Sequence, residues 1–176
     1  MKPDAMIVID VQTALIEAHP YREEAFLSTL QKLLTACRSH GVPVIYIQHE
    51  EAGSELERGT DGWRIAQAVA PQPGEKVFAK RFNSSFRQTD LHGHLQALGA
   101  KRLILCGMQT EYCVDTTVKV AFELGYEVSV PEGGTDTFDN GPFKAEDLLS
   151  YYQWRIWHNE LAKVTPVEDL LAAIES

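Results

Sequence analysis

The feature that most constrains the fold is a set of short, continuous apolar runs rich in β-branched residues. A run of this kind, without alternating polar positions, fits a strand that is buried on both faces, as in a parallel sheet. Such strands are expected at Ala5–Val11, Val42–Gln48, Arg102–Met108 and Tyr126–Glu132, with a weaker one at Leu161–Pro166 and a short one around Val77–Phe78.

Helical patterns lie between these runs, because apolar residues recur there at three- and four-residue steps. Gly41, Gly99 and Gly125 follow the expected ends of three of them, as helix-terminating glycines do. The predicted helices are Glu24–Ser39, Asp90–Leu98, Cys113–Leu124, Phe143–Asn159 and Val167–Ile174. Alternating strands and helices predict an α/β fold with right-handed crossovers and helices on both faces of a parallel sheet.

The length of 176 residues fits a single domain, 1–176, with a sizeable core. A net charge of -9 argues against nucleic acid or an anionic membrane as a partner. The N-terminal stretch "MKPDAMIVIDVQ" lacks the layout of a signal peptide, and no apolar run is long enough to span a bilayer. We therefore expect a cytoplasmic protein whose three cysteines stay reduced. The sequence contains no CxxC pair, so it does not suggest a structural zinc site.

Three residues that follow predicted strands could carry chemistry, since open parallel sheets place their sites outside the carboxyl ends of the strands. Asp10 ends the first apolar run, Lys80 lies in "VFAKRFNSSF", and Cys113 lies in "GMQTEYCVDTT". Each also has an ordinary interpretation. Asp10 would serve as a turn or cap residue, Lys80 would point to solvent, and Cys113 would be a small buried residue.

Cys113 is the most informative of the three because it stands at the predicted N-terminus of a helix. There the helix dipole and the free N–H groups favour a thiolate and lower the pKa of the thiol. The same N–H groups bind a developing oxyanion. An aspartate can accept the thiol proton, and a lysine stabilises both ionised groups. The three residues together predict a nucleophilic cysteine with its base and its cation.

At this point the sequence resembles the isochorismatase-like cysteine hydrolases, from about Asp4 to Val130. The matching segments are "IVIDVQ", "KRFNSSF" and "CGMQTEYCVDTTVKVAFELGYEV", in that order. The resemblance implies a three-layer α/β/α sandwich around a central, mostly parallel, Rossmann-like sheet, with a catalytic triad at Asp10, Lys80 and Cys113. It also implies a non-proline cis peptide before Gln109. The N–H groups of Gln109 and Cys113 would then form the oxyanion hole.

The activity implied by this resemblance is hydrolysis of a C–N bond in a small amide-type substrate through a thioester on Cys113. One alternative is an isochorismatase-type vinyl ether hydrolase. Another is a catalytically silent isochorismatase-like domain used for protein association, although an intact triad argues against it. A phosphatase-like use of Asp10 is disfavoured because Gln12 stands where that chemistry needs a second acid.

Nicotinamidases of the same family carry a metal site that begins with an Asp-x-His element after the second strand. Here that region reads "YIQHEEAG", which has His49 without the aspartate pattern. His92 and His94 are two positions apart on a predicted helix and so point to different faces. We therefore expect no metal and no cofactor, and we interpret His49 as a polar loop residue.

The substrate pocket is expected to include Gln12, Trp63, Phe82, Glu111 and Tyr112 besides the triad, and each of these residues could equally be structural. The irregular stretch 49–76, which bears Trp63, has the length of a functional lid. The aromatic segment with Tyr151, Tyr152, Trp154 and Trp157 is either an oligomer interface or a core helix. The expected partners are a small-molecule substrate and further copies of the chain, as a dimer or larger homo-oligomer.

Overall fold

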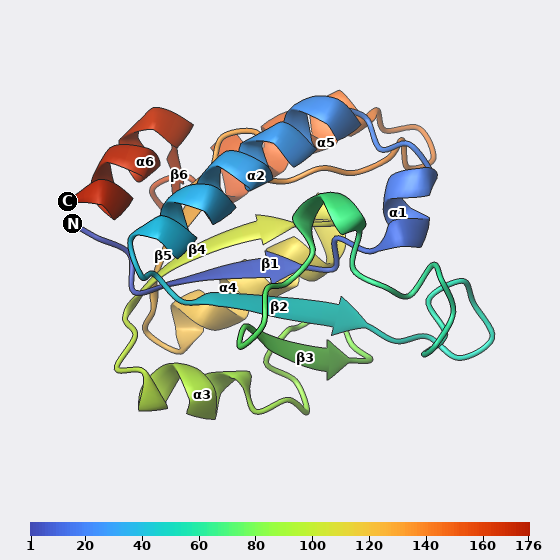
Figure 1. Ribbon diagram of the computed structural model, residues 1–176. Helices are drawn as coiled ribbons and strands as arrows, with labels where there is room; N and C mark the ends of the chain where they lie inside the picture. The colour runs from blue at the N-terminus through green and yellow to red at the C-terminus, as the bar shows by residue number, and fades with distance from the viewer.

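The computed structural model describes residues 1–176 and contains one sheet with the strand order β3-β2-β1-β4-β5-β6. All neighbouring strands are parallel (Figure 1). The strands are β1 (Ala5–Ile9), β2 (Val44–His49), β3 (Lys76–Lys80), β4 (Arg102–Gly107), β5 (Glu127–Pro131) and β6 (Lys163–Thr165). The parallel sheet predicted from the apolar runs is confirmed, and the weakest run forms the edge strand β6.

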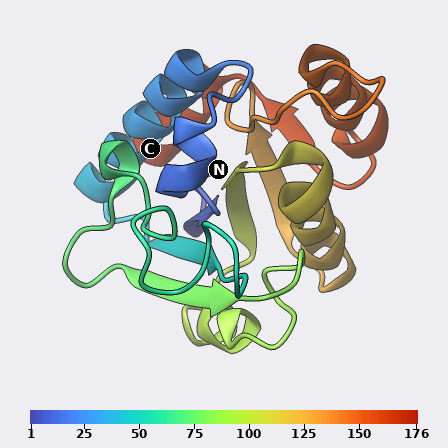
Figure 2. The same cartoon turned by 90° about the vertical axis from the view of Figure 1, so that its right-hand side faces the viewer.

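Helices cover both faces of this sheet, which gives the three-layer sandwich (Figures 1 and 2). They are α1 (Thr13–Glu17), α2 (Glu23–Ser39), α3 (Leu91–Ala97), α4 (Asp115–Glu123), α5 (Ala145–Tyr151) and α6 (Val167–Glu175). Three shorter helical turns complete the set: η1 (Gln67–Val69), η2 (Thr110–Val114) and η3 (Tyr152–Trp157). The sequence pattern did not predict α1, because only Ala14 of its five residues is buried.

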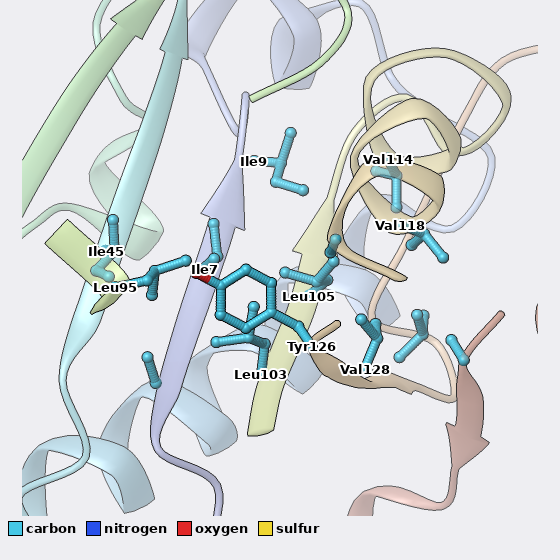
Figure 3. Close-up of a cluster of buried hydrophobic side chains, with 14 of the residues drawn as sticks. Ile7, Ile9, Ile45, Leu95, Leu103, Leu105, Val114, Val118, Tyr126 and Val128 are labelled. Carbon is cyan, nitrogen blue, oxygen red and sulfur yellow. The ribbon is translucent and has the colours of Figure 1, made fainter. Parts of the chain in front are cut away.

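The central strand β1 shows why its residues form a strand with no polar face. Ala5, Ile7 and Ile9 pack with α3 and α4 on one side of the sheet (Figure 3). Met6 and Val8 pack with α2 and α6 on the other side. All five side chains are fully buried. The apolar residues of β1 therefore join two separate cores, and this requirement explains the continuous hydrophobic run.

The predicted helices differ from the observed ones at two places. Helical structure begins at Thr110 rather than at Cys113, because the Thr110 N–H and hydroxyl both donate to the Asp136 carbonyl and start the turn early. The predicted helix at 143–159 is α5 followed by η3. Trp157 is fully buried there, whereas Trp154 is 45% exposed, so the segment contributes to both core and surface.

The long irregular stretch after β2 returns to the segment that follows β1. Gln12 and Ile65 form an antiparallel bridge, and the Thr13 N–H donates to the Arg64 carbonyl. In Figure 1 the loop extends past the arrowhead of β2. The loop thus lies at the carboxyl edge of the sheet. No helix in the structure has the length and apolar character needed to span a membrane.

Candidate active site

The carboxyl ends of four neighbouring strands bring four reactive side chains together. Asp10 directly follows β1, His49 is the last residue of β2, and Lys80 is the last residue of β3. Cys113 lies in η2, which the chain reaches from β4. The parallel register pairs His49 with Lys80, so their backbones lie side by side. This is the edge at which open parallel sheets form their sites.

The Lys80 ammonium is the centre of this cluster. Its Nζ lies 2.6 Å from Asp10 Oδ2 and 3.2 Å from Cys113 Sγ. A third contact, of 3.0 Å, joins it to His49 Nδ1. The Lys80 side chain has no exposed surface and that of Asp10 has 2%. An ion pair removed from water to this degree needs close partners, and this geometry provides them.

Asp10 is held in an uncommon backbone conformation, with φ at 51°. Its N–H donates to the Ile47 carbonyl of β2, which fixes the turn that leaves β1. Apart from the ion pair with Lys80, neither carboxylate oxygen of Asp10 has a hydrogen-bond partner. A buried carboxylate with free lone pairs is able to accept a proton from a neighbouring group.

Cys113 is partly buried, and its Sγ lies within 4.8 Å of a carboxylate oxygen of Asp10. Burial raises the pKa of Cys113 to about 12, and the Asp10 charge acts in the same direction, while Lys80 lowers it. This shift favours the thiol form of Cys113 and is opposite in direction to the one that a helix N-terminus produces, because burial and Asp10 together outweigh Lys80.

The segment between β4 and η2 presents a free backbone donor next to the cysteine. The Met108–Gln109 peptide bond is cis, and the Gln109 N–H donates no hydrogen bond within the protein. The Met108 N–H donates to the Ile9 carbonyl at 2.9 Å, so this segment is tied to the end of β1. A fixed, unpaired N–H of this kind can stabilise an oxyanion.

A cavity of about 420 Å³ opens over the cluster. Its walls combine charged, polar and apolar side chains, the mixture that orients a small molecule. They are formed by Asp10, Leu15, His49, Glu51, Leu56, Asn83, Met108, Gln109, Tyr112 and Cys113. Of the further pocket residues predicted from the sequence, Tyr112 lies in this wall. Its hydroxyl accepts a hydrogen bond from Asn140 Nδ2 at 2.8 Å.

Gln12 and Trp63 lie next to the site but not in the cavity wall. The Gln12 side chain is fully buried and donates to the backbone carbonyls of His49 and Trp63. Its Oε1 accepts from the His49 N–H at 2.9 Å. The structure thus uses Gln12 to join β1, β2 and the loop after β2. Trp63 contributes its carbonyl to this junction, and its ring lies near Arg58.

Phe82 and Glu111 are also outside the cavity wall. The Phe82 ring is covered by the Arg87 guanidinium, whose Cζ is 3.8 Å from the ring centroid. Glu111 accepts from the Thr137 hydroxyl at 2.6 Å and so holds the loop after β5 against η2. Both side chains therefore have partners within the protein. The sequence pattern alone could not distinguish such structural contacts from contact with a substrate.

The cluster also contains three atoms with the character of metal ligands. The carboxylate of Asp10, the imidazole of His49 and the thiol of Cys113 have such atoms within 4.8 Å of one another. However, the Lys80 ammonium contacts all three groups. A cation at the same place would meet a buried positive charge at short range, so these residues do not fit a metal.

His49 is the functional candidate that the sequence interpretation missed. It was expected to be a polar loop residue, but it ends β2 and contacts Lys80, so that expectation is wrong. His49 does stand at the carboxyl end of a parallel strand, where sites of such sheets form, although the sequence there has no Asp-x-His pattern. Leu56 and Asn83 carried no comparable signal, because their places in the wall depend on how two loops fold.

A family model described as the isochorismatase domain matches residues 4–151. A streptothricin hydrolase from Streptomyces noursei is 34% identical over 138 residues, which cover 77% of this chain and 50% of that protein.

Two solved structures share the whole fold. An isochorismatase-family protein from Chromobacterium violaceum ATCC 12472 has a TM-score of 0.91 and 32% identity, and the match covers 99% of this chain and 94% of that one. A cysteine hydrolase from Pseudomonas syringae pv. phaseolicola 1448A has a TM-score of 0.91 and 26% identity, with 97% and 92% covered. The similarity therefore includes the sheet, the helical layers and the carboxyl edge.

Proposed function

The chain belongs to the isochorismatase family of hydrolases, and from this premise we propose that it cleaves a C–N bond of a small amide-type substrate with Cys113 as nucleophile. The observation that carries the proposal is that one buried ammonium, on Lys80, contacts both Asp10 and Cys113. A cysteine nucleophile needs a base within reach and a nearby charge that favours its ionised form. Asp10 and Lys80 meet these two needs.

In the first half of the reaction the Cys113 thiol transfers its proton to Asp10 as sulfur attacks the substrate carbonyl. The carbonyl oxygen takes up the negative charge and is stabilised by the N–H groups of Gln109 and Cys113. Asp10 then returns the proton to the nitrogen as the C–N bond breaks. The products of this half are a free amine and a thioester on Cys113.

In the second half Asp10 takes a proton from water as the water oxygen attacks the thioester carbonyl. Collapse of the second oxyanion breaks the C–S bond, and the proton held by Asp10 returns to sulfur. The product is a carboxylic acid, and the enzyme regains its thiol. Wherever Asp10 or the Cys113 sulfur carries a negative charge in this cycle, the adjacent Lys80 ammonium balances it.

The raised pKa of Cys113 fits this sequence of steps. With a pKa near 12, only a small fraction of the thiol is ionised before substrate binds, and the proton passes to Asp10 as sulfur forms the new bond. Ionisation and attack are then coupled through Asp10. This arrangement differs from that of a free thiolate at a helix N-terminus, which reacts with any accessible electrophile.

The experiment that tests the proposal is a screen of small amides for ammonia or amine release, with streptothricin included because a relative is named for its hydrolysis. Cys113→Ala is the central variant, and Cys37→Ala is the matched control because Cys37 is buried away from the site. We expect loss of turnover in Cys113→Ala alone. Full activity of Cys113→Ala on a true substrate would refute the mechanism.

A second arm separates this reaction from vinyl ether hydrolysis, in which no acyl group is transferred to sulfur. Rapid acid quenching followed by intact-mass measurement should detect the acyl group on Cys113 during amide turnover. Turnover of isochorismate with no such adduct would assign the vinyl ether reaction instead.

A further inference from the structure

The Lys80 ammonium has a third partner that the proposed triad does not use. A protonated lysine has three N–H donors and no acceptor. Asp10 Oδ2 takes one donor, Cys113 Sγ takes the second, and His49 Nδ1 takes the third at 3.0 Å. Because the lysine side chain has no exposed surface, water cannot replace a missing partner without local rearrangement.

The His49 imidazole is held in place through its backbone. The Gln12 side chain binds this residue twice, since Oε1 accepts from the His49 N–H at 2.9 Å and Nε2 donates to its carbonyl at 3.0 Å. The register of β2 and β3 places His49 opposite Lys80, and the Glu50 N–H donates to the Lys80 carbonyl at 2.8 Å. The acceptor nitrogen is therefore a fixed feature of the site.

The contact with Lys80 defines the state of the imidazole. Nδ1 can accept a hydrogen bond from an ammonium only when it carries no proton, so the ring is neutral and its proton is on Nε2. Burial lowers the pKa of His49, and Lys80 lowers it further, whereas the charges of Asp10, Glu51 and Glu50 act in the opposite direction.

The charged and titratable groups around the His49 ring come from several elements. Lys80 comes from β3, Asp10 follows β1, and Cys113 comes from η2. Glu50 follows His49 in the chain and is paired with Arg58 and Arg81. The Lys80 ammonium is thus the direct charged contact of the ring.

We propose that His49 is a positioning residue of this site, which holds the Lys80 ammonium between Asp10 and Cys113 and releases it when the imidazole takes up a proton. This inference rests on the proposed cysteine chemistry and adds a fourth residue to it. A proton on Nδ1 replaces an acceptor with a donor and sets two positive charges 3.0 Å apart. Lys80 then moves away from the imidazole, and activity falls as the pH is lowered.

Three variants test the proposal. His49→Asn keeps an acceptor oxygen close to the position of Nδ1 but cannot titrate. His49→Leu removes the acceptor. His19→Asn is the control, because His19 is on the surface with its side chain 82% exposed and has a positive φ of 54°, which asparagine also tolerates.

The first measurement is the rate at which iodoacetamide alkylates Cys113 at neutral pH, followed by intact mass and peptide mapping. We expect His49→Leu to react about 10- to 100-fold more slowly than His49→Asn, because small displacements of a charged group at a reacting centre have effects of this size. Equal rates in the two variants would overturn the proposal. This measurement needs no substrate, so it tests the role of His49 even if the proposed amide hydrolysis fails.

The second measurement is the pH profile of kcat on an amide substrate. We expect the acid limb of the profile to move to lower pH in His49→Asn and to stay in place in His19→Asn. If His49 served only in folding, the acid limb of the kcat profile would lie at the same pH in His49→Asn as in the wild type. That result would contradict the proposal. If His49→Leu does not fold, the comparison of His49→Asn with the wild type still decides the question.

Discussion

The buried ion pair between Lys80 and Asp10 makes the sharpest prediction about stability. The Lys80→Met substitution keeps a long apolar side chain but removes the ammonium that lies 2.6 Å from the Asp10 carboxylate. Asp10 is then left buried, with no other hydrogen-bond partner for either oxygen. Removal of one partner from a buried pair destabilises a protein by about 3–5 kcal/mol, and the missing partners of Asp10 favour the upper part of that range.

The companion variant is Asp10→Asn, which leaves the Lys80 ammonium without its carboxylate. The double variant has neither charge, so it avoids the penalty of an unpaired buried ion. We therefore expect the double variant to lose less stability than the sum of the single losses, with a coupling energy of about 2 kcal/mol or more. Because a domain of this size is stable by only about 5–15 kcal/mol, each single loss should be easy to measure.

The assay is urea denaturation of the four proteins at neutral pH. If the stability loss of the double variant equals the sum of the two single losses within about 0.5 kcal/mol, this description of the site is refuted. Residues that do not interact show such additivity.

Three further predictions concern the scaffold. Gly107→Ala should destabilise the protein far more than Gly125→Ala, because a Cβ at Gly107 would overlap the Ile9 carbonyl oxygen, whereas Gly125 has open space around it. Both positions have positive φ, so denaturation should show a loss of about 1–2 kcal/mol at Gly125 and clearly more at Gly107. Burial raises the pKa of Cys37 to about 12, so the unfolded chain loses that proton first, and this one thiol should contribute a loss of stability of about 1.4 kcal/mol per pH unit between pH 9 and 12. Cys37→Ala should make that decline shallower in denaturation curves measured across this range, and an unchanged slope would contradict the assignment. Trp157→Phe removes the indole donor to Asp115 Oδ1, at 3.0 Å, and should lower the free energy of unfolding by about 2 kcal/mol.

The sequence could predict the sheet because the necessary information is local. A strand buried on both faces must be apolar at every position, and β1 is apolar from Ala5 to Ile9 for that reason. The order of Asp10, Lys80 and Cys113 at the ends of strands could also be predicted, because parallel strands present their carboxyl ends on one edge. The short helix α1 could not, since a single buried residue leaves no periodic pattern.

The roles of the neighbouring polar residues depended on contacts between distant parts of the chain. Gln12 was a reasonable candidate for substrate contact, yet its amide is used by the backbones of His49 and Trp63. Glu111 likewise supports the loop after β5 through Thr137. A glutamine or glutamate that faces a substrate and one that binds a loop have the same sequence signature.

By itself the sequence determined a parallel α/β sheet, helices on both of its faces, and a common edge for an aspartate, a lysine and a cysteine, because hydrophobic periodicity and strand order are properties of the chain. The tertiary structure alone decided that burial raises the pKa of Cys113 and that His49 accepts the third hydrogen bond of Lys80. Both outcomes depend on the desolvation and the distances of groups that lie far apart in sequence. Those quantities exist only once the strands have assembled around β1.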